Sequence, residues 1–172
     1  SSSARSFNAG ALSSVKPTKA DGFELVLYPT VMFGDGKMAN VSWLHELPDP
    51  VTKICWDNYA SISIATAAKL KAKEGTVLEL TINDKVHKLP AHIQPGLHDD
   101  VISIAVGYGR TDAGKVGNGI GQNAYQMVTF QNGSPIFSGH KVEVKNSGVK
   151  YPLANPQGHH TMEGRQIVVE AT

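Results

Sequence analysis

The sequence predicts a mainly β domain that closes into a barrel and contains little helix. Three observations support this: short segments of alternating apolar and polar residues, turn residues between them at close intervals, and a single run of strong helix formers. Hydrophobic residues make up 41% of the chain and charged residues 18%, which is typical of a globular domain with its own core. A length of 172 residues suits one domain.

The first part of the domain is expected to alternate a strand with loops. Residues 23–27 alternate and predict a strand, which Pro29 ends. Residues 33–43 begin with a Gly-Asp-Gly turn and are expected to form an exposed loop. The prolines of the following LPDP segment lack N–H donors and exclude a central strand there. Residues 51–56 are rich in β-branched side chains and predict a second short strand.

One helix is expected at residues 64–73, where IATAAKLKAK is rich in helix formers. Ser63 is the predicted N-cap and Gly75 the predicted C-terminal cap. Its apolar face is expected to consist of Ile64, Ala67, Ala68 and Leu70.

The remaining strands are expected in the second half of the chain. Three alternating segments predict inward-facing rows, which are Leu78, Leu80 and Ile82, then Leu89, Ala91 and Ile93, then Ile102, Ile104 and Val106. Asn83-Asp84 and Pro95-Gly96 are the predicted turns between them. Further short strands are expected on both sides of Gly133, at residues 142–144, and at residues 167–169.

Charge and cysteine content exclude several classes of protein. The net charge is +1 with scattered basic residues, so neither a nucleic-acid footprint nor an anionic membrane patch is expected. A single cysteine, Cys55, rules out an internal disulfide framework, a cysteine zinc site and a self-contained iron–sulfur cluster. No apolar run approaches the ~20 residues of a membrane helix, so direct membrane insertion is not expected.

The most unusual segment is GYGRTDAGKVGNGIGQN, which holds six glycines between Gly107 and Gly121. Glycines free the backbone for left-handed angles and for close approach to a ligand. Successive N–H groups in such a loop form an anion nest, to which Arg110 and Lys115 would add charge. The spacing fits neither the P-loop nor the GxGxxG pattern, so tight turns or a partner interface remain open beside ligand binding.

Other side chains give weaker signals. The seven histidines are expected at the surface or against a partner, because their spacings do not bring three or four metal ligands together. His87 and His92 are predicted to face opposite sides of one strand. No catalytic residue is assigned, since the chain lacks a GxSxG elbow and a Cys–His pair. Trp43, Trp56 and Tyr59 either stack on a purine or pack at the rim of the core, and the second interpretation is favoured.

Several segments together resemble a known family. They are a strand ending in LYPT, then GDGKMANVSWLHELPDPVTKICWDNYASIS, the helix TAAKLKAKEGTVLEL, LPAHIQPGLHDDVISIAVGYGRTDAGKVGNGIGQNAY, and the end YPLANPQGHHTMEGRQIVVEAT. From Phe23 onward the chain is similar to the C-terminal domain of the molybdopterin-like half of Tat-translocated molybdopterin oxidoreductase iron–sulfur proteins. These are the large iron–sulfur subunits of alternative complex III and its relatives.

The resemblance implies a fold, a parent protein and a location. The implied fold is a double-psi β-barrel of the aspartate-decarboxylase type with one or a few short helices, at residues 22–172 with a C-terminal extension. Residues 1–21 would be a disordered linker or a tail foreign to the domain. The parent subunit would carry the iron–sulfur clusters outside this segment, and its partners would be the other subunits of a membrane respiratory complex. That complex would lie on the periplasmic side of the bacterial inner membrane.

The resemblance also bears on the cofactor. Related molybdenum enzymes place a Gly-Arg motif after the first barrel strand, whereas this chain reads Pro29-Thr30-Val31-Met32 there. A non-catalytic domain without a cofactor is therefore the leading hypothesis, and a functional domain that binds molybdopterin guanine dinucleotide is the alternative. The residues that would line the cofactor site, or its vestige, are Gly107, Tyr108, Gly109, Arg110, Asn118 and Asn123. A stand-alone hydrolase or decarboxylase is a third class, for which no nucleophile is found.

Overall fold

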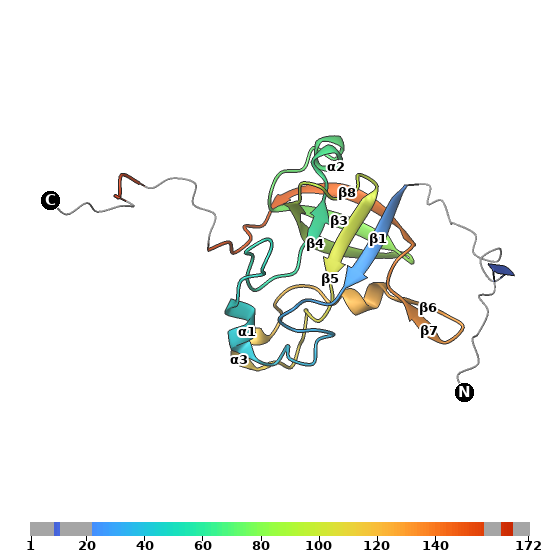
Figure 1. The fold of residues 1–172 in the computed structure, drawn as a ribbon, viewed down its shortest axis with the longest axis horizontal. Helices are drawn as coiled ribbons and strands as arrows, with labels where there is room; N and C mark the ends of the chain where they lie inside the picture. The colour runs from blue at the N-terminus through green and yellow to red at the C-terminus, as the bar shows by residue number, and fades with distance from the viewer. Residues whose placement is uncertain (1–8, 11–21, 157–162, 167–172) are drawn as a thin grey trace, which may run out of the picture.

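The computed structural model describes residues 9–10, 22–156 and 163–166, and its centre is a closed six-stranded barrel (Figure 1). The strand order around the barrel is β1-β5-β2-β4-β3-β8. Neighbouring strands run parallel in the pairs β1/β5 and β2/β4 and antiparallel in the other pairs. The predicted mainly β barrel is confirmed, and this mixed closed arrangement is consistent with a double-psi β-barrel.

The barrel strands are β1 (Phe23–Tyr28), β2 (Ala60–Ile62), β3 (Thr76–Ile82), β4 (Lys85–Ile93), β5 (Val101–Ala105) and β8 (His140–Lys150). A separate two-stranded sheet consists of β6 (Thr129–Gln131) and β7 (Ser134–Ile136). The short helices are α1 (Ser42–Glu46), α2 (Ile64–Lys69), α3 (Gly114–Gly117) and the 3₁₀ helix η2 (Ala124–Met127). Within the described residues, no helix has the length and apolar character that crossing a membrane requires.

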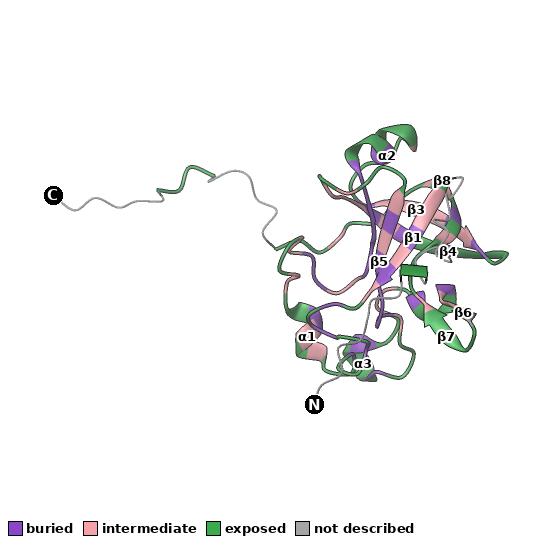
Figure 2. Ribbon diagram, turned by 45° about the vertical axis from the view of Figure 1, so that its right-hand side comes forward, coloured by how far each residue is buried: buried purple, intermediate pink, exposed green. Residues whose placement is uncertain are grey.

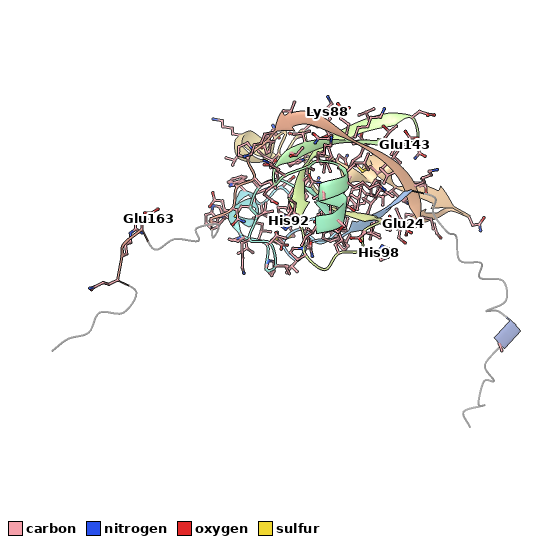
Figure 3. The ribbon with its side chains drawn as sticks, turned by 90° about the horizontal axis from the view of Figure 1, so that it is seen from above. Glu24, Lys88, His92, His98, Glu143 and Glu163 are labelled. Atoms are coloured by element: carbon pink, nitrogen blue, oxygen red, sulfur yellow. The ribbon has the colours of Figure 1, made fainter. Side chains whose placement is uncertain are left out.

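The inside of the barrel is filled by the rows of side chains that the alternating pattern predicts. Leu78, Leu80, Leu89, Ile102 and Ile104 are all fully buried, and the purple bands of the barrel strands in Figure 2 mark this core. Burying such a side chain stabilises the fold by about 1.5–3 kcal/mol relative to leaving it exposed. Charged side chains, among them Lys88 and Glu143, project from the outer surface (Figure 3).

The tight turns follow the sequence closely. Asn83 and Asp84 connect β3 to β4 with φ angles of 49° and 61°, which is the two-residue turn that matches the twist of a hairpin. Asn132 (φ 51°) and Gly133 (φ 79°) connect β6 to β7 in the same way. The turns predicted at Asn83-Asp84 and around Gly133 are confirmed, as is the turn predicted at Pro95-Gly96.

The strand predicted at residues 51–56 is wrong. The Asp49 carboxylate accepts hydrogen bonds from the N–H groups of Val51 (2.9 Å) and Thr52 (2.8 Å), which folds the chain into a turn. Lys53 then has a φ of 62°, which no strand tolerates. The barrel strand of this region lies later, at β2, whose three residues are all buried and so show no alternation.

The exposed loop predicted at residues 33–43 is confirmed in part, because most of the segment lies in turns and is exposed but some of its residues are buried. Phe33 and Ala39 are each only 1% exposed and belong to a second, smaller core cluster with Met32, Ala105 and Tyr108. Helix α1 begins at the end of this segment. Apolar residues at 32, 33 and 39 follow neither the spacing of a helix nor that of a strand. The sequence pattern therefore did not predict that some of them are buried.

The predicted helix is shorter than expected. Ser63 caps α2 as predicted, by accepting a hydrogen bond from the Thr66 N–H at 3.0 Å. The helix ends at Lys69, and Gly75 is not its cap. The predicted apolar face is partly wrong, because Ile64 is 61% exposed whereas Ala67 is buried.

Histidines are less exposed than predicted. His45 and His87 are buried, with exposed fractions of 3% and 8%. His87 shares the inward face of β4 with Leu89, while the side chain of His92 lies on the other face, as predicted. His159, His160, the predicted strand at 167–169 and most of residues 1–21 lie outside the described residues.

Candidate functional site

The glycine-rich segment leaves the barrel at the end of β5 and forms a layer of loops below it, together with α1 and α3 (Figure 1). Val106 is the last residue tied to the barrel, through a hydrogen bond from its N–H to the Tyr28 carbonyl at 2.9 Å. Beyond it the chain runs through α3 and returns to the barrel end at η2. The segment therefore covers one end of the barrel, and the barrel strands fix where its loops begin and end.

A cleft of about 530 Å³ opens beside this segment. Five of the six predicted site residues line it, namely Gly107, Tyr108, Gly109, Arg110 and Asn123. Its remaining lining comes from Thr111, Asp112, Tyr125 and Gln126, which sequence reasoning had not assigned. A volume of this size lies within the ~300–1,000 Å³ of small-molecule sites. Whether these residues bind a ligand stays a prediction.

Asn118 does not line the cleft. Its side-chain oxygen instead accepts a hydrogen bond from the Ala113 N–H, across the turn of α3. Lys115, the second predicted cation of the loop, is also absent from the cleft lining. Of the two predicted cations, the cleft thus contains only Arg110.

The glycines of the segment approach the protein's own backbone. A Cβ added at Gly107 would lie 3.0 Å from the Cα of Gly36. A Cβ at Gly109 would overlap the backbone nitrogen of Asn123, and one at Gly121 would lie 2.7 Å from the Asn58 side-chain oxygen. The sequence correctly indicated close approach, but the partner at these three positions is the protein itself: another loop at Gly107 and Gly121, and the far end of the same segment at Gly109.

Residues 34–37, which we call the strap, hold two polar side chains of the cleft. The Arg110 guanidinium donates to the Gly36 carbonyl, and the Tyr125 hydroxyl donates to the Asp35 carbonyl. Lys37 pairs with the Asp35 carboxylate at 3.3 Å on the exposed side of the strap. Two side chains that a ligand would use are thus engaged by backbone carbonyls.

Asn58 organises the loops from below. It is 1% exposed, and its amide donates to the carbonyls of Ala105 and Gln122, both at 2.9 Å. Its oxygen accepts from the Gln122 N–H at 2.8 Å. The neighbouring Asp57 accepts from the Gly121 N–H at 3.1 Å. Sequence reasoning missed this pair, whose only signal is a polar dipeptide between two large aromatic residues.

An aromatic cluster supports the wall of the cleft. The Tyr108 ring packs edge-on against Phe33 at 4.9 Å between centroids, and Phe33 lies 4.6 Å from His45. His45 stacks on Trp56 at 5.7 Å, and its Nε2 hydrogen-bonds to the Ala39 carbonyl at 2.9 Å. Burial raises the pKa of the Tyr108 hydroxyl, so it stays protonated at neutral pH.

The three aromatic residues considered for purine stacking are dispersed. Trp56 packs on His45, while Tyr59 is 5% exposed. Trp43 is 83% exposed on α1. None of the three lines the cleft beside Arg110. Among the described residues, no group of three or more His, Cys, Asp and Glu side chains is arranged to hold a metal ion.

Fold and site together define a small mainly β barrel domain with a loop-built cleft at one end. No protein-family model matches the chain, and no curated protein matches it in sequence. Among solved structures, acetylene hydratase from Pelobacter acetylenicus is similar, with a TM-score of 0.49 and 16% sequence identity. The similar region covers 71% of this chain and 18% of that chain.

Proposed function

We propose that this chain is a non-catalytic module of a larger, molybdopterin-oxidoreductase-like iron–sulfur subunit, and that it serves assembly within a quinol-oxidising electron-transfer complex. The observation that carries the proposal is the self-engagement of the cleft. Arg110 and Tyr125 are held by the strap, and the spaces beside Gly107 and Gly109 are filled by backbone. The resemblance of the segments from Phe23 onward supplies the identity of the parent.

The cleft does not fit the diphosphate of a molybdopterin guanine dinucleotide. Such a group needs several free donors or cations, and Arg110 is the only Lys or Arg in the lining. The lining also contains the carboxylate of Asp112. Carboxylates near a diphosphate repel it, so these residues favour a domain without the cofactor.

The rest of the proposal concerns the parent. The module joins the remainder of its subunit, which carries the iron–sulfur clusters, and the other subunits of an alternative-complex-III-like assembly. That assembly lies on the periplasmic side of the bacterial inner membrane, and the module is associated with the membrane only through it. The resemblance supports each of these statements.

Titration of the protein with GDP and with molybdopterin guanine dinucleotide tests the proposal. Amide chemical shifts of Gly107, Gly109 and Asn123 and the melting temperature are both followed. We expect no saturable response in either measurement, because the Gly109 N–H, the Arg110 guanidinium and the Tyr125 hydroxyl are engaged internally. Micromolar binding of either ligand, with shifts confined to these residues, would overturn the proposal.

A second candidate is a working cofactor-binding domain of a molybdenum or tungsten oxidoreductase. The observation that favours it is the volume of about 530 Å³ beside Arg110, which suits one part of a nucleotide. Metal analysis of the full-length parent, purified under cofactor-replete conditions, separates the two. Molybdenum or tungsten near one atom per chain supports this candidate, and a metal-free parent contradicts it.

A further inference from the structure

A second, smaller pocket lies on the outside of the barrel and shares no lining residue with the cleft. Its volume is about 180 Å³. Ser103 of β5 belongs to its wall and faces outward, since the neighbouring Ile102 and Ile104 fill the core. The volume is below the ~300 Å³ of sites for whole small molecules, so the pocket suits a single functional group.

The side chains that line the pocket are aromatic, uncharged polar or negatively charged. Two tyrosines, Tyr28 and Tyr59, form the aromatic part of its lining, and Ser103 and Gln94 supply uncharged polar groups. The remaining wall is the turn at residues 49–52, which brings in a carboxylate. Lysine, arginine and histidine are absent from this lining. Aromatic faces, neutral oxygens and one negative charge together favour a cation.

The negative charge comes from Asp49, and only one of its oxygens is engaged in the described structure. Oδ1 accepts from the N–H groups of Val51 and Thr52 and from the Thr52 hydroxyl at 3.2 Å. The hydrogen bonds found for this carboxylate among the described residues all end on Oδ1, so Oδ2 keeps its acceptor capacity. Asp49 lines the same pocket as Tyr28 and Tyr59; burial raises the pKa of Tyr28, and the charge of Asp49 adds to this effect.

A buried hydroxyl next to the pocket lacks a partner. Ser61 of β2 is 0% exposed, and its Oγ has no hydrogen-bond partner in the described structure. Ser61 is paired directly with Ser103 in the antiparallel ladder of β2 and β5. Directly paired residues point to the same face with Cβ atoms ~5 Å apart, so this hydroxyl lies beside the wall of the pocket. Ser61 itself is not among the residues that line the pocket, so Ser103 is the member of this pair that can contact a bound group.

We propose that this pocket binds an alkylammonium group, with Asp49 as its counter-ion, the Tyr28 and Tyr59 rings beside it and the Ser103 hydroxyl as a further acceptor. The group belongs either to a small amine or to a lysine side chain of a partner protein. An ammonium carries three donors, and the carboxylate and hydroxyl oxygens of the pocket are matching acceptors. The site is independent of the cleft, so it stands whether or not the proposed function does.

The probe is n-butylammonium chloride, titrated at constant ionic strength and followed by the amide shifts of Thr52, Gln94 and Ser103. Sodium butyrate, which has the same alkyl chain and the opposite charge, is the control ligand. We expect saturable shifts with the ammonium salt and none with butyrate. Equal responses to both salts, or no saturable response up to the solubility limit, would overturn the proposal.

Asp49→Asn is the decisive variant, because an asparagine oxygen still accepts from the two N–H groups of the turn. It removes the charge and keeps the backbone, so we expect binding to weaken about tenfold or more, as loss of a charge-assisted hydrogen bond requires. Asp84→Asn, in the β3–β4 turn, is the matched control and should bind like the original protein. Unchanged binding by Asp49→Asn contradicts the proposal.

A blocked lysine peptide and its acetyl-lysine counterpart separate the two sources of the ammonium group. Tighter binding of the lysine peptide than of butylammonium, abolished by acetylation, assigns the pocket to a partner's side chain. Tighter binding of butylammonium assigns it to a small amine. Binding of the acetylated peptide as tight as that of the free lysine peptide would contradict a charge-based site.

Discussion

Replacing Gly109 by alanine tests whether the glycine-rich segment is shaped by its own backbone. Gly109 has a φ of 74°, and a Cβ there would overlap the Asn123 nitrogen and lie 2.6 Å from the Gln122 carbonyl carbon. Alanine in the left-handed region costs about 1–2 kcal/mol. Overlap with rigid backbone adds about 1–3 kcal/mol.

Gly119 is the matched control for this variant. Its φ is 72°, almost the same as that of Gly109, but an added Cβ would meet nothing within 4 Å. Both substitutions reduce the freedom of the unfolded chain equally, which stabilises each variant by about 0.4–1 kcal/mol. We therefore expect Gly109→Ala to be less stable than Gly119→Ala by the overlap alone, about 1–3 kcal/mol.

Urea unfolding measures this difference directly. With a slope of about 2 kcal/mol per M, the midpoint of Gly109→Ala should lie about 0.5–1.5 M below that of Gly119→Ala. Equal midpoints would mean that the loop relaxes freely around Gly109. The space beside the glycine would then be open to a ligand, and the reasoning behind the proposed function would be refuted.

Three further predictions concern side chains that hold the fold. Asn58→Ala should lower the free energy of unfolding by about 2–4 kcal/mol in urea, because three buried hydrogen bonds lose their partner. Burial lowers the pKa of His87, so below about pH 6.5 the unfolded chain binds a proton on this residue more readily than the folded protein does. The free energy of unfolding should therefore decrease as the pH drops below about 6.5, and it should decrease less in His87→Leu. Burial alone would raise the pKa of Glu74, but hydrogen bonds from His92 and a backbone N–H lower it on balance. Ionised Glu74 therefore stabilises the fold at neutral pH, and this stabilisation is lost below about pH 4.5. In Glu74→Gln the free energy of unfolding should decrease less steeply with falling pH in this acid range, and an unchanged pH dependence would contradict this.

The strands with a clear period of two were predictable from the sequence because each faces the core on one side only. β3 shows this best, with Leu78, Leu80 and Ile82 buried and the residues between them half-buried. β2 was not predictable, because all three of its residues are buried and alternation is therefore absent. At residues 51–56 the β-branched composition was overridden by one carboxylate, Asp49, which captured two N–H groups of the turn.

The position of the candidate cleft could be predicted, but its partners could not. A run of glycines is visible in the sequence, whereas the strap is 74 residues away from Arg110, and Asn58 lies 64 residues from Gln122. These contacts exist only because barrel closure brings the ends of β1, β2 and β5 together. No local sequence pattern encodes these long-range contacts, so residue types alone left ligand binding open while favouring tight turns or a partner interface.

The ligand-binding and the packing interpretations of the glycine-rich segment differ in where its backbone N–H groups point. A nest that serves a ligand must present its donors outward, whereas here the Gly109 N–H donates to the Ile120 carbonyl and the Gly119 N–H to the Arg110 carbonyl, both at 2.8 Å. Those two N–H groups close the segment upon itself. A ligand that used the side chains of the cleft would first have to displace Arg110 and Tyr125 from backbone carbonyls of the strap. Whether this end of the barrel binds a nucleotide or serves as an interface depends on the free energy of replacing the strap carbonyls by a ligand as partners of Arg110 and Tyr125. The number of glycines does not decide it.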